Sequence, residues 1–190
     1  MSDYRTRISG KLTMRPRRFA VPAITVAGVA LLVAALVAFA AKPPRDCTAA
    51  QYKQFDFFAG DWDTYDVADS TKIIARNRVT RMLDGCALRE QYVQTDGMQG
   101  ESFSAYDAAR HVWHQSWLTN HGSLLLLDGG LIDGRMVLAG TDHAMDGSAS
   151  LLRGVWWSKG GSVHERAERS TDGGATWLPV FDILFRPHTG

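Results

Sequence analysis

The feature that most constrains the fold is a series of glycine-containing turns that recur along the chain after residue 80. They are Asp84-Gly85, Asp96-Gly97, Asn120-His121-Gly122, Asp133-Gly134, Asp146-Gly147, Lys159-Gly160-Gly161 and Asp172-Gly173-Gly174. Asp-Gly and Gly-Gly pairs supply the positive φ angles that tight hairpins require. The pattern therefore predicts a succession of β-hairpins.

Short runs that alternate apolar and polar residues lie between these turns, as is typical of β-strands. The ten predicted strands are Trp62–Val67, Lys72–Met82, Ala87–Thr95, Glu101–Asp107, His111–Thr119, Ser123–Leu127, Arg135–Thr141, Ser150–Ser158, Ser162–Ser170 and Thr176–Arg186. The 18 glycines and the aromatic content of 10% also favour a turn-rich β protein over a helical bundle. Because closure removes exposed edges, we expect an all-β fold, an antiparallel up-and-down barrel of about 8–10 strands.

An apolar segment precedes this predicted domain. Residues 19–41 carry no charge, and six basic residues lie in the 18 residues before them. A hydrophobic helix of this length can span the bilayer, and the positive-inside rule directs the rest of the chain across the membrane. Two interpretations of residues 1–41 stay open: a signal peptide cleaved after Ala38-Phe39-Ala40, and an uncleaved membrane anchor. Either one predicts a periplasmic or extracellular domain.

The region between this leader and the barrel is short. Residues 42–54 contain Pro43 and Pro44, which favour an extended linker, followed by a short helical turn with Thr48 as its N-cap. The barrel is expected over residues 55–190.

The two cysteines, Cys47 and Cys86, both lie on the exported side of the leader. In an oxidising compartment they are expected to form a disulfide, which would stabilise the domain by about 4 kcal/mol; two free buried thiols are the alternative.

The charge distribution argues against nucleic acid as a partner. The whole chain has 21 basic and 20 acidic residues, but residues 19–190 hold only 15 basic residues against 19 acidic ones. A net negative domain lacks the basic surface that binds phosphate backbones.

Two of the predicted strands carry polar residues among large aromatic ones. One face of Ala87–Val93 reads Leu88, Glu90, Tyr92, and one face of Val112–Leu118 reads Trp113, Gln115, Trp117. Such a mixture is typical of a ligand cavity inside a barrel, and a packed aromatic core with polar residues at strand ends is the alternative.

We therefore expect the barrel to bind a small-molecule or lipid-like ligand, with no metal or cofactor. The predicted ligand-binding residues are Glu90, Tyr92, Trp113, Gln115, Trp117, Arg153 and Glu168. The aromatic side chains would supply apolar area, while Glu90, Gln115 and Arg153 would orient the ligand. Trp156 alternates with Arg153 and is expected on the other face, as a wall or exterior residue.

Two other functions stay open. Glu90 and Glu168 are the best candidates for an acid/base pair in an enzyme, although each is more often a carboxylate that forms an ion pair with an arginine, for which Arg153 is the natural partner. The other alternative is an interaction module with a solid barrel. A metal or haem site built from His114 and His164 is a weaker hypothesis, because the six histidines are scattered.

Two short motifs predict structural roles. Gly60-Asp61-Trp62 resembles the G-x-W signature of lipocalins and related calycins, in which the tryptophan closes one barrel end beneath an arginine of the last strand. This resemblance implies a cation–π contact between Arg186 and Trp62. Residues 170–177 resemble the Asp-box of sialidase propellers, so Asp172 and Trp177 are expected to stabilise a hairpin.

A longer set of motifs extends over residues 47–186: Phe55-Asp56-Phe57-Phe58-x-Gly60-Asp61-Trp62, Asp84-Gly85-Cys86-Ala87-Leu88-Arg89-Glu90, Tyr106-Asp107, Trp113-His114-Gln115-x-Trp117, Leu126-x-Asp128-Gly129-Gly130, Arg153-x-x-Trp156, Glu168-x-Ser170-x-Asp172 and Phe181-Asp182. In these the chain resembles a family of uncharacterised, mostly bacterial exported proteins. The resemblance implies a lipocalin-like barrel and no catalytic residues. Phe58 and Ala167 depart from the family pattern, which has a tryptophan and a bulky aromatic residue there.

Overall fold

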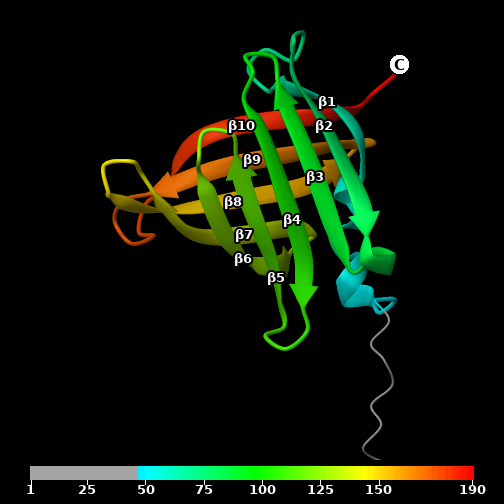
Figure 1. Cartoon of the computed structure of the whole chain (residues 1–190), viewed down its shortest axis with the longest axis horizontal. Coiled ribbons are helices and arrows are strands. Elements are labelled where there is room, and N and C mark those ends of the chain that lie inside the picture. The colour runs from blue at the N-terminus through cyan, green and yellow to red at the C-terminus, as the bar shows by residue number, and fades with distance from the viewer. Residues whose placement is uncertain (1–46) are drawn as a thin grey trace, which may run out of the picture. The chain divides into compact units, whose positions relative to one another are not determined.

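The computed structural model describes residues 47–190, which form a closed antiparallel barrel (Figure 1). Its ten strands are β1 (Gly60–Asp66), β2 (Ile73–Met82), β3 (Ala87–Gln94), β4 (Gln99–Asp107), β5 (Val112–Thr119), β6 (Leu124–Ile132), β7 (Arg135–His143), β8 (Ala149–Lys159), β9 (Ser162–Ser170) and β10 (Leu178–Pro187). Each strand pairs with its neighbours in sequence, and β10 closes onto β1. The predicted ten-stranded up-and-down barrel is confirmed. The leader predicted over residues 1–41 and the first part of the predicted linker, residues 42–46, lie outside the described residues.

Strand β6 exceeds its predicted length the most. The predicted strand was Ser123–Leu127, whereas β6 continues through Asp128-Gly129-Gly130 to Ile132. A Cβ atom at Gly129 would collide with the backbone carbonyl oxygen of Val137 on β7. The glycine is therefore needed because two backbones approach closely inside a strand pair, and no turn occurs there.

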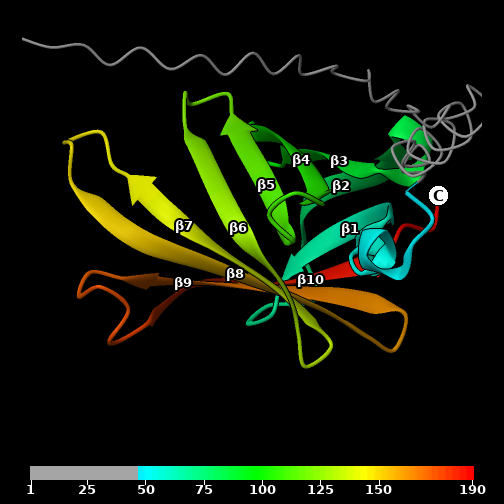
Figure 2. The same ribbon diagram turned by 90° about the horizontal axis from the view of Figure 1, so that it is seen from below.

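A short segment before β1 closes one end of the barrel (Figure 2). It contains two 3₁₀-helices, η1 (Ala50–Lys53) and η2 (Asp56–Phe58). The predicted N-cap is wrong, since Ala49 occupies the cap of η1 and no side chain bonds there. A disulfide joins Cys47 to Cys86, which follows η3 (Leu83–Gly85) between β2 and β3, so the predicted pairing is confirmed. Among the described residues, none of the helices has the length and apolar character needed to cross a membrane.

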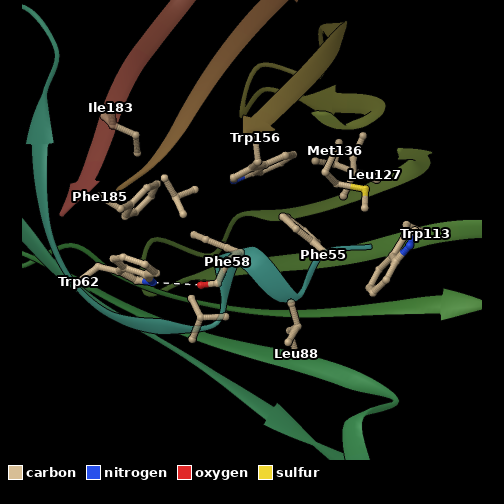
Figure 3. Packing of buried hydrophobic residues seen from close by; sticks show 13 residues of the cluster. Phe55, Phe58, Trp62, Leu88, Trp113, Leu127, Met136, Trp156, Ile183 and Phe185 are labelled. Carbon is tan, nitrogen blue, oxygen red and sulfur yellow. Dashed lines mark hydrogen bonds between the residues drawn. The ribbon is translucent and has the colours of Figure 1, made fainter. Parts of the chain in front are cut away.

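Aromatic side chains fill this end of the barrel (Figure 3). We call this group the plug; its aromatic members are Phe55, Phe58, Trp62, Trp113 and Phe185. Phe55 is 0% exposed and lies 5.8 Å from Trp113, 5.6 Å from Trp156 and 5.3 Å from Phe58, measured between ring centroids. Phe58 in turn lies 5.3 Å from Phe185 of β10. Edge-to-face contacts of this kind stabilise a core beyond simple burial.

The Gly60-x-Trp62 motif has a steric explanation. Trp62 points into the barrel, its Nε1 donates to the Phe58 carbonyl over 3.0 Å, and its ring folds back over Gly60. A Cβ atom at position 60 would collide with that ring. Only glycine therefore lets the indole lie flat against the start of β1.

The expected contact between Arg186 and Trp62 does not form. Arg186 pairs with Asp63 across β10 and β1, so both face outward while Trp62 faces inward. The guanidinium instead lies over the Tyr65 ring, 4.5 Å from its centroid, and donates to the Ser70 carbonyl over 2.8 Å. The barrel wall separates the two residues that the resemblance had paired.

The Asp-box forms the hairpin between β9 and β10. Asp172 accepts hydrogen bonds from the Thr176 backbone N–H over 2.9 Å and from the Thr176 hydroxyl over 2.6 Å. The Trp177 indole donates to the Gly174 carbonyl over 3.1 Å. These bonds hold the pKa of Asp172 well below its usual range, as expected for a structural turn carboxylate.

Candidate functional site

The barrel encloses a cavity of ≈390 Å³. It extends from the inner side of the plug towards the opposite end of the barrel, where β1 and β3 end. Its polar lining residues are Asp66, Glu90, Tyr92, Gln94, Gln115 and Glu165. Its apolar lining residues are Ile74, Met98, Trp117, Leu125, Leu127, Leu152, Trp156, Ala167, Phe181 and Ile183. The solid barrel considered as an alternative is therefore found only at the plugged end.

Four of the seven predicted ligand-binding residues line this cavity. Glu90 and Tyr92 come from β3, and Gln115 and Trp117 come from β5. Trp113 also points inward, but it lies one step closer to the plug. It is 1% exposed, and its indole donates to the Gln54 side-chain oxygen over 3.0 Å. Trp113 thus belongs to the plug.

Arg153 and Glu168 do not face the cavity, contrary to the prediction. They are cross-strand partners on the outer face of β8 and β9, and Arg153 Nη2 lies 2.6 Å from Glu168 Oε2. The same guanidinium lies over the Trp177 ring, 4.1 Å from its centroid. Because their neighbours Gly154 and Ala167 face inward, Arg153 and Glu168 face outward. The predicted acid/base pair of Glu90 and Glu168 therefore lies on opposite sides of the wall.

The histidines considered as a metal or haem site also lie on the outer face. His114 Nδ1 lies 2.8 Å from Asp128 Oδ1, and the His164 ring stacks on Trp157 at 5.0 Å. Within residues 47–190, no three His, Cys, Asp or Glu side chains come together as a metal site would require.

Among the lining residues that the sequence did not predict, Glu165 and Trp156 lie next to each other in the wall. These two are direct cross-strand partners on β9 and β8. A signal for Trp156 existed, because Gly154-Val155-Trp156 repeats the spacing of Gly60-Asp61-Trp62. A Cβ atom at Gly154 would collide with the Trp156 ring. Once Trp156 is assigned to the inner face, strand pairing also assigns Glu165 to that face.

Glycine also makes room for Trp117. A Cβ atom at Gly100 of β4 would collide with the Trp117 ring. The indoles of Trp117 and Trp156 therefore lie against glycines of the barrel wall. This arrangement keeps two large side chains in the lining while leaving the centre of the cavity open.

Glu90 lies at the centre of a buried hydrogen-bond network. Its Oε1 accepts from Asn77 Nδ2 over 2.9 Å, and its Oε2 accepts from the Ser102 hydroxyl over 2.8 Å. Gln115 Nε2 donates to the same Ser102 oxygen over 3.2 Å. Burial nevertheless raises the pKa of Glu90 above its ordinary value, because the two hydrogen bonds only partly offset the loss of water.

Two other titratable groups of the cavity, Glu165 and Tyr92, have pKa values that are shifted in the same direction. Burial, and then the negative charge of Glu90, raise the pKa of Glu165 well above its ordinary value. Burial raises the pKa of the Tyr92 phenol, and the charges of Glu165, Glu90 and Asp96 raise it further. Ionisable groups that are shifted together inside a cleft are typical of functional sites.

The arrangement combines apolar and aromatic walls with a few polar groups held by strands. Such a lining can bury the apolar part of a small molecule and orient it through hydrogen bonds or charge. Comparison with known proteins returns no family model and no curated protein that matches this chain.

Proposed function

We propose that this protein is an exported barrel that binds a small, partly apolar ligand in its interior. The observation that carries the proposal is the ≈390 Å³ cavity, which lies within the range of small-molecule pockets of about 300–1,000 Å³. Its lining comes from most of the strands of the closed barrel, so the site is largely formed before any ligand arrives.

The contrast with the plug supports the proposal. Large rings fill the plugged end, whereas at the cavity the wall carries Gly100, Gly154 and Ala167. The Trp117 and Trp156 rings occupy the space beside Gly100 and Gly154, so these indoles lie against the wall, and the small Ala167 leaves the adjoining part of the cavity open. Ala167 is also one of the two positions where the resembled family carries a bulky aromatic residue.

Export is part of the same proposal. The disulfide between Cys47 and Cys86 is compatible with an oxidising compartment, and residues 19–41 have the length and composition of a signal peptide or anchor. The resemblance to a family of exported lipocalin-like proteins agrees with both features.

The proposal is tested with phenylnaphthylamine, a neutral dye that fluoresces when it enters an apolar site. Ala167→Phe adds an aromatic ring inside the cavity, where Ala167 is 1% exposed. The matched control is Ala139→Phe, at an exposed alanine on the outer face of β7. Binding is measured by fluorescence titration, and folding is checked by circular dichroism.

We expect the unmodified protein and Ala139→Phe to bind the dye alike, with one site per chain. Ala167→Phe should weaken binding at least about tenfold, because the added ring occupies the space of the ligand. Equal binding by a folded Ala167→Phe protein, or no dye binding by the unmodified protein, would contradict the proposal.

A further inference from the structure

The cavity has an unbalanced charge. Asp66, Glu90 and Glu165 line it, and none of its lining residues is a lysine, arginine or histidine. Buried carboxylates are normally paired with a cation or with several hydrogen-bond donors. When Glu90 and Glu165 are ionised, their countercharge is therefore missing from the lining itself.

The network around Glu90 is arranged to hold an anion. The Asn77 amide donates to one carboxylate oxygen, and the Ser102 hydroxyl lies within hydrogen-bond distance of the other. Gln115 Nε2 donates to the Ser102 hydroxyl oxygen, so the Ser102 hydroxyl proton remains available to donate to Glu90. Glu90 is only 6% exposed, so this anion is presented to the cavity rather than to bulk solvent.

The amide that holds Glu90 has one unused polar atom. Asn77 Oδ1 is a buried acceptor that has no hydrogen-bond partner among the described residues, in a side chain that is 1% exposed. Asn77 lies on the inner face of β2, opposite Tyr92, and its Nδ2 is committed to Glu90. Asn77 is not among the residues that line the cavity, so its amide acts on a ligand only through the Glu90 carboxylate that it holds.

The aromatic lining suits the same kind of group. Trp117 and Tyr92 pack with their ring centroids 6.1 Å apart, and Trp156 lies across from Glu165. The faces of these rings carry partial negative charge and attract cations that approach within about 6 Å. Ring faces next to carboxylates are a recurrent environment for ammonium groups.

We propose that the ligand is an organic amine whose ammonium group binds between Glu90 and Glu165 while its apolar part lies against Trp117 and Trp156. This inference rests on the proposed function, because it names the chemical class of the ligand in the same cavity. It gives each carboxylate a partner of opposite charge and offers a donor to the network around Glu90.

The proposal predicts how binding depends on pH. The other titratable groups that line the cavity are Asp66 of β1 and Tyr92 of β3, neither of which is cationic. Because the pKa values of Glu90 and Glu165 are raised, both lose protons only as the pH rises above their ordinary range. Amine binding should strengthen over that rise, while binding of a neutral analogue should not change.

The test compares phenethylamine with phenethyl alcohol and hydrocinnamate, which share its ring and chain but are neutral and anionic. Affinities for the full chain are measured by calorimetry and by displacement of phenylnaphthylamine. We expect the amine to bind at least about tenfold more tightly than the alcohol at pH 8, with the anion weakest. Glu165→Gln should remove most of this preference, and Glu168→Gln on the outer face should keep it.

The outcomes separate this inference from the function on which it rests. If the dye binds but the amine and the alcohol bind equally to the unmodified protein, the amine proposal is wrong and the ligand cavity stands. If no dye and none of the three compounds bind, both proposals fail. The comparison on the unmodified protein decides the question even if Glu165→Gln does not fold.

Discussion

The two ends of the barrel are built from the same strands but have opposite chemistry. At the plug, Trp62 and Trp113 donate their indole N–H groups to Phe58 and Gln54, and close aromatic packing fills the space. Near the cavity, Asn77 Oδ1 is buried without a hydrogen-bond partner among residues 47–190, and the Trp156 indole lies opposite the Glu165 carboxylate. The two plug indoles are therefore held by hydrogen bonds, whereas the cavity is lined by carboxylates that have no cationic partner in its lining.

The change occurs within single strands. Along the inner face of β3 the side chains run from Leu88 in the core to Glu90 and Tyr92 in the cavity, and along β5 from Trp113 to Gln115. Two residues along a strand, about 7 Å, therefore separate a core position from a site position. The comparison indicates that the plug supplies stability and so permits polar groups in the cavity.

The largest loss of stability is expected when the aromatic ring at the centre of the plug is removed. Phe55→Ala deletes a ring that is 0% exposed and contacts four other aromatic rings. We expect it to lower the free energy of unfolding by about 3–5 kcal/mol, the usual range for a buried phenylalanine. Urea denaturation followed by circular dichroism measures the change.

Phe103→Ala is the matched control, because Phe103 faces outward on β4 and is 42% exposed. Its substitution should cost about 1 kcal/mol or less. Similar losses for Phe55→Ala and Phe103→Ala would show that the plug does not stabilise the barrel as described.

A substitution in the cavity should have the opposite effect on stability. Since the folded state raises the pKa of Glu165, it holds this proton to a higher pH than the unfolded chain does. Native Glu165 therefore lowers stability as the pH rises above about 4.5, the ordinary value for glutamate. Glu165→Gln should be more thermostable than the unmodified protein at pH 8, and the difference should narrow towards pH 4.

Thermal melts across this pH range measure the effect. Glu168→Gln should show no such gain, because that change removes an ion pair with Arg153 instead. A pH-independent difference between Glu165→Gln and the unmodified protein would argue against an uncompensated carboxylate in the cavity.

The smallest effect is expected on the outer face. Arg153→Ala removes a partly exposed ion pair and a contact with Trp177, so stability should fall by only about 1 kcal/mol. Dye binding should be unchanged, because Arg153 lies outside the cavity. Loss of dye binding in a folded Arg153→Ala protein would indicate that Arg153 contributes to the ligand site.

The sequence was sufficient to predict the strands and the turns, because hairpin turns have local chemical signatures. It also predicted the disulfide, because the chain has two cysteines and both follow the leader. It also grouped Glu90 with Tyr92 and Gln115 with Trp117, on the faces of β3 and β5 that line the cavity. The prediction was wrong where it placed Arg153 and Glu168 among the ligand-binding residues, because both lie on the outer face. Pairing fixes which residues are neighbours, but a one-residue shift decides which face of the wall they occupy.

The failure to predict Glu165 as an inward-facing residue has the same physical cause. Glu165 lies between His164 and Arg166, so its strand offers charged or polar side chains on both faces and the alternation alone does not favour one. The contact between Gly154 and Trp156 settles the face, but it depends on an indole folding back over its own strand. The contact of Arg186 with Tyr65 was missed because a motif carries no information on which side of the wall an arginine lies.

The most direct test of the comparison uses the indole N–H signals of the six tryptophans in an NMR spectrum of the full chain. Two tryptophans belong to the plug, two to the cavity and two, Trp157 and Trp177, to the outer face. Each signal is assigned by a tryptophan-to-phenylalanine variant, and phenethylamine is then titrated. The account predicts that the signals of Trp117 and Trp156 shift while those of Trp62 and Trp113 stay in place. Equal shifts at the plug, or shifts confined to the outer face, would contradict it.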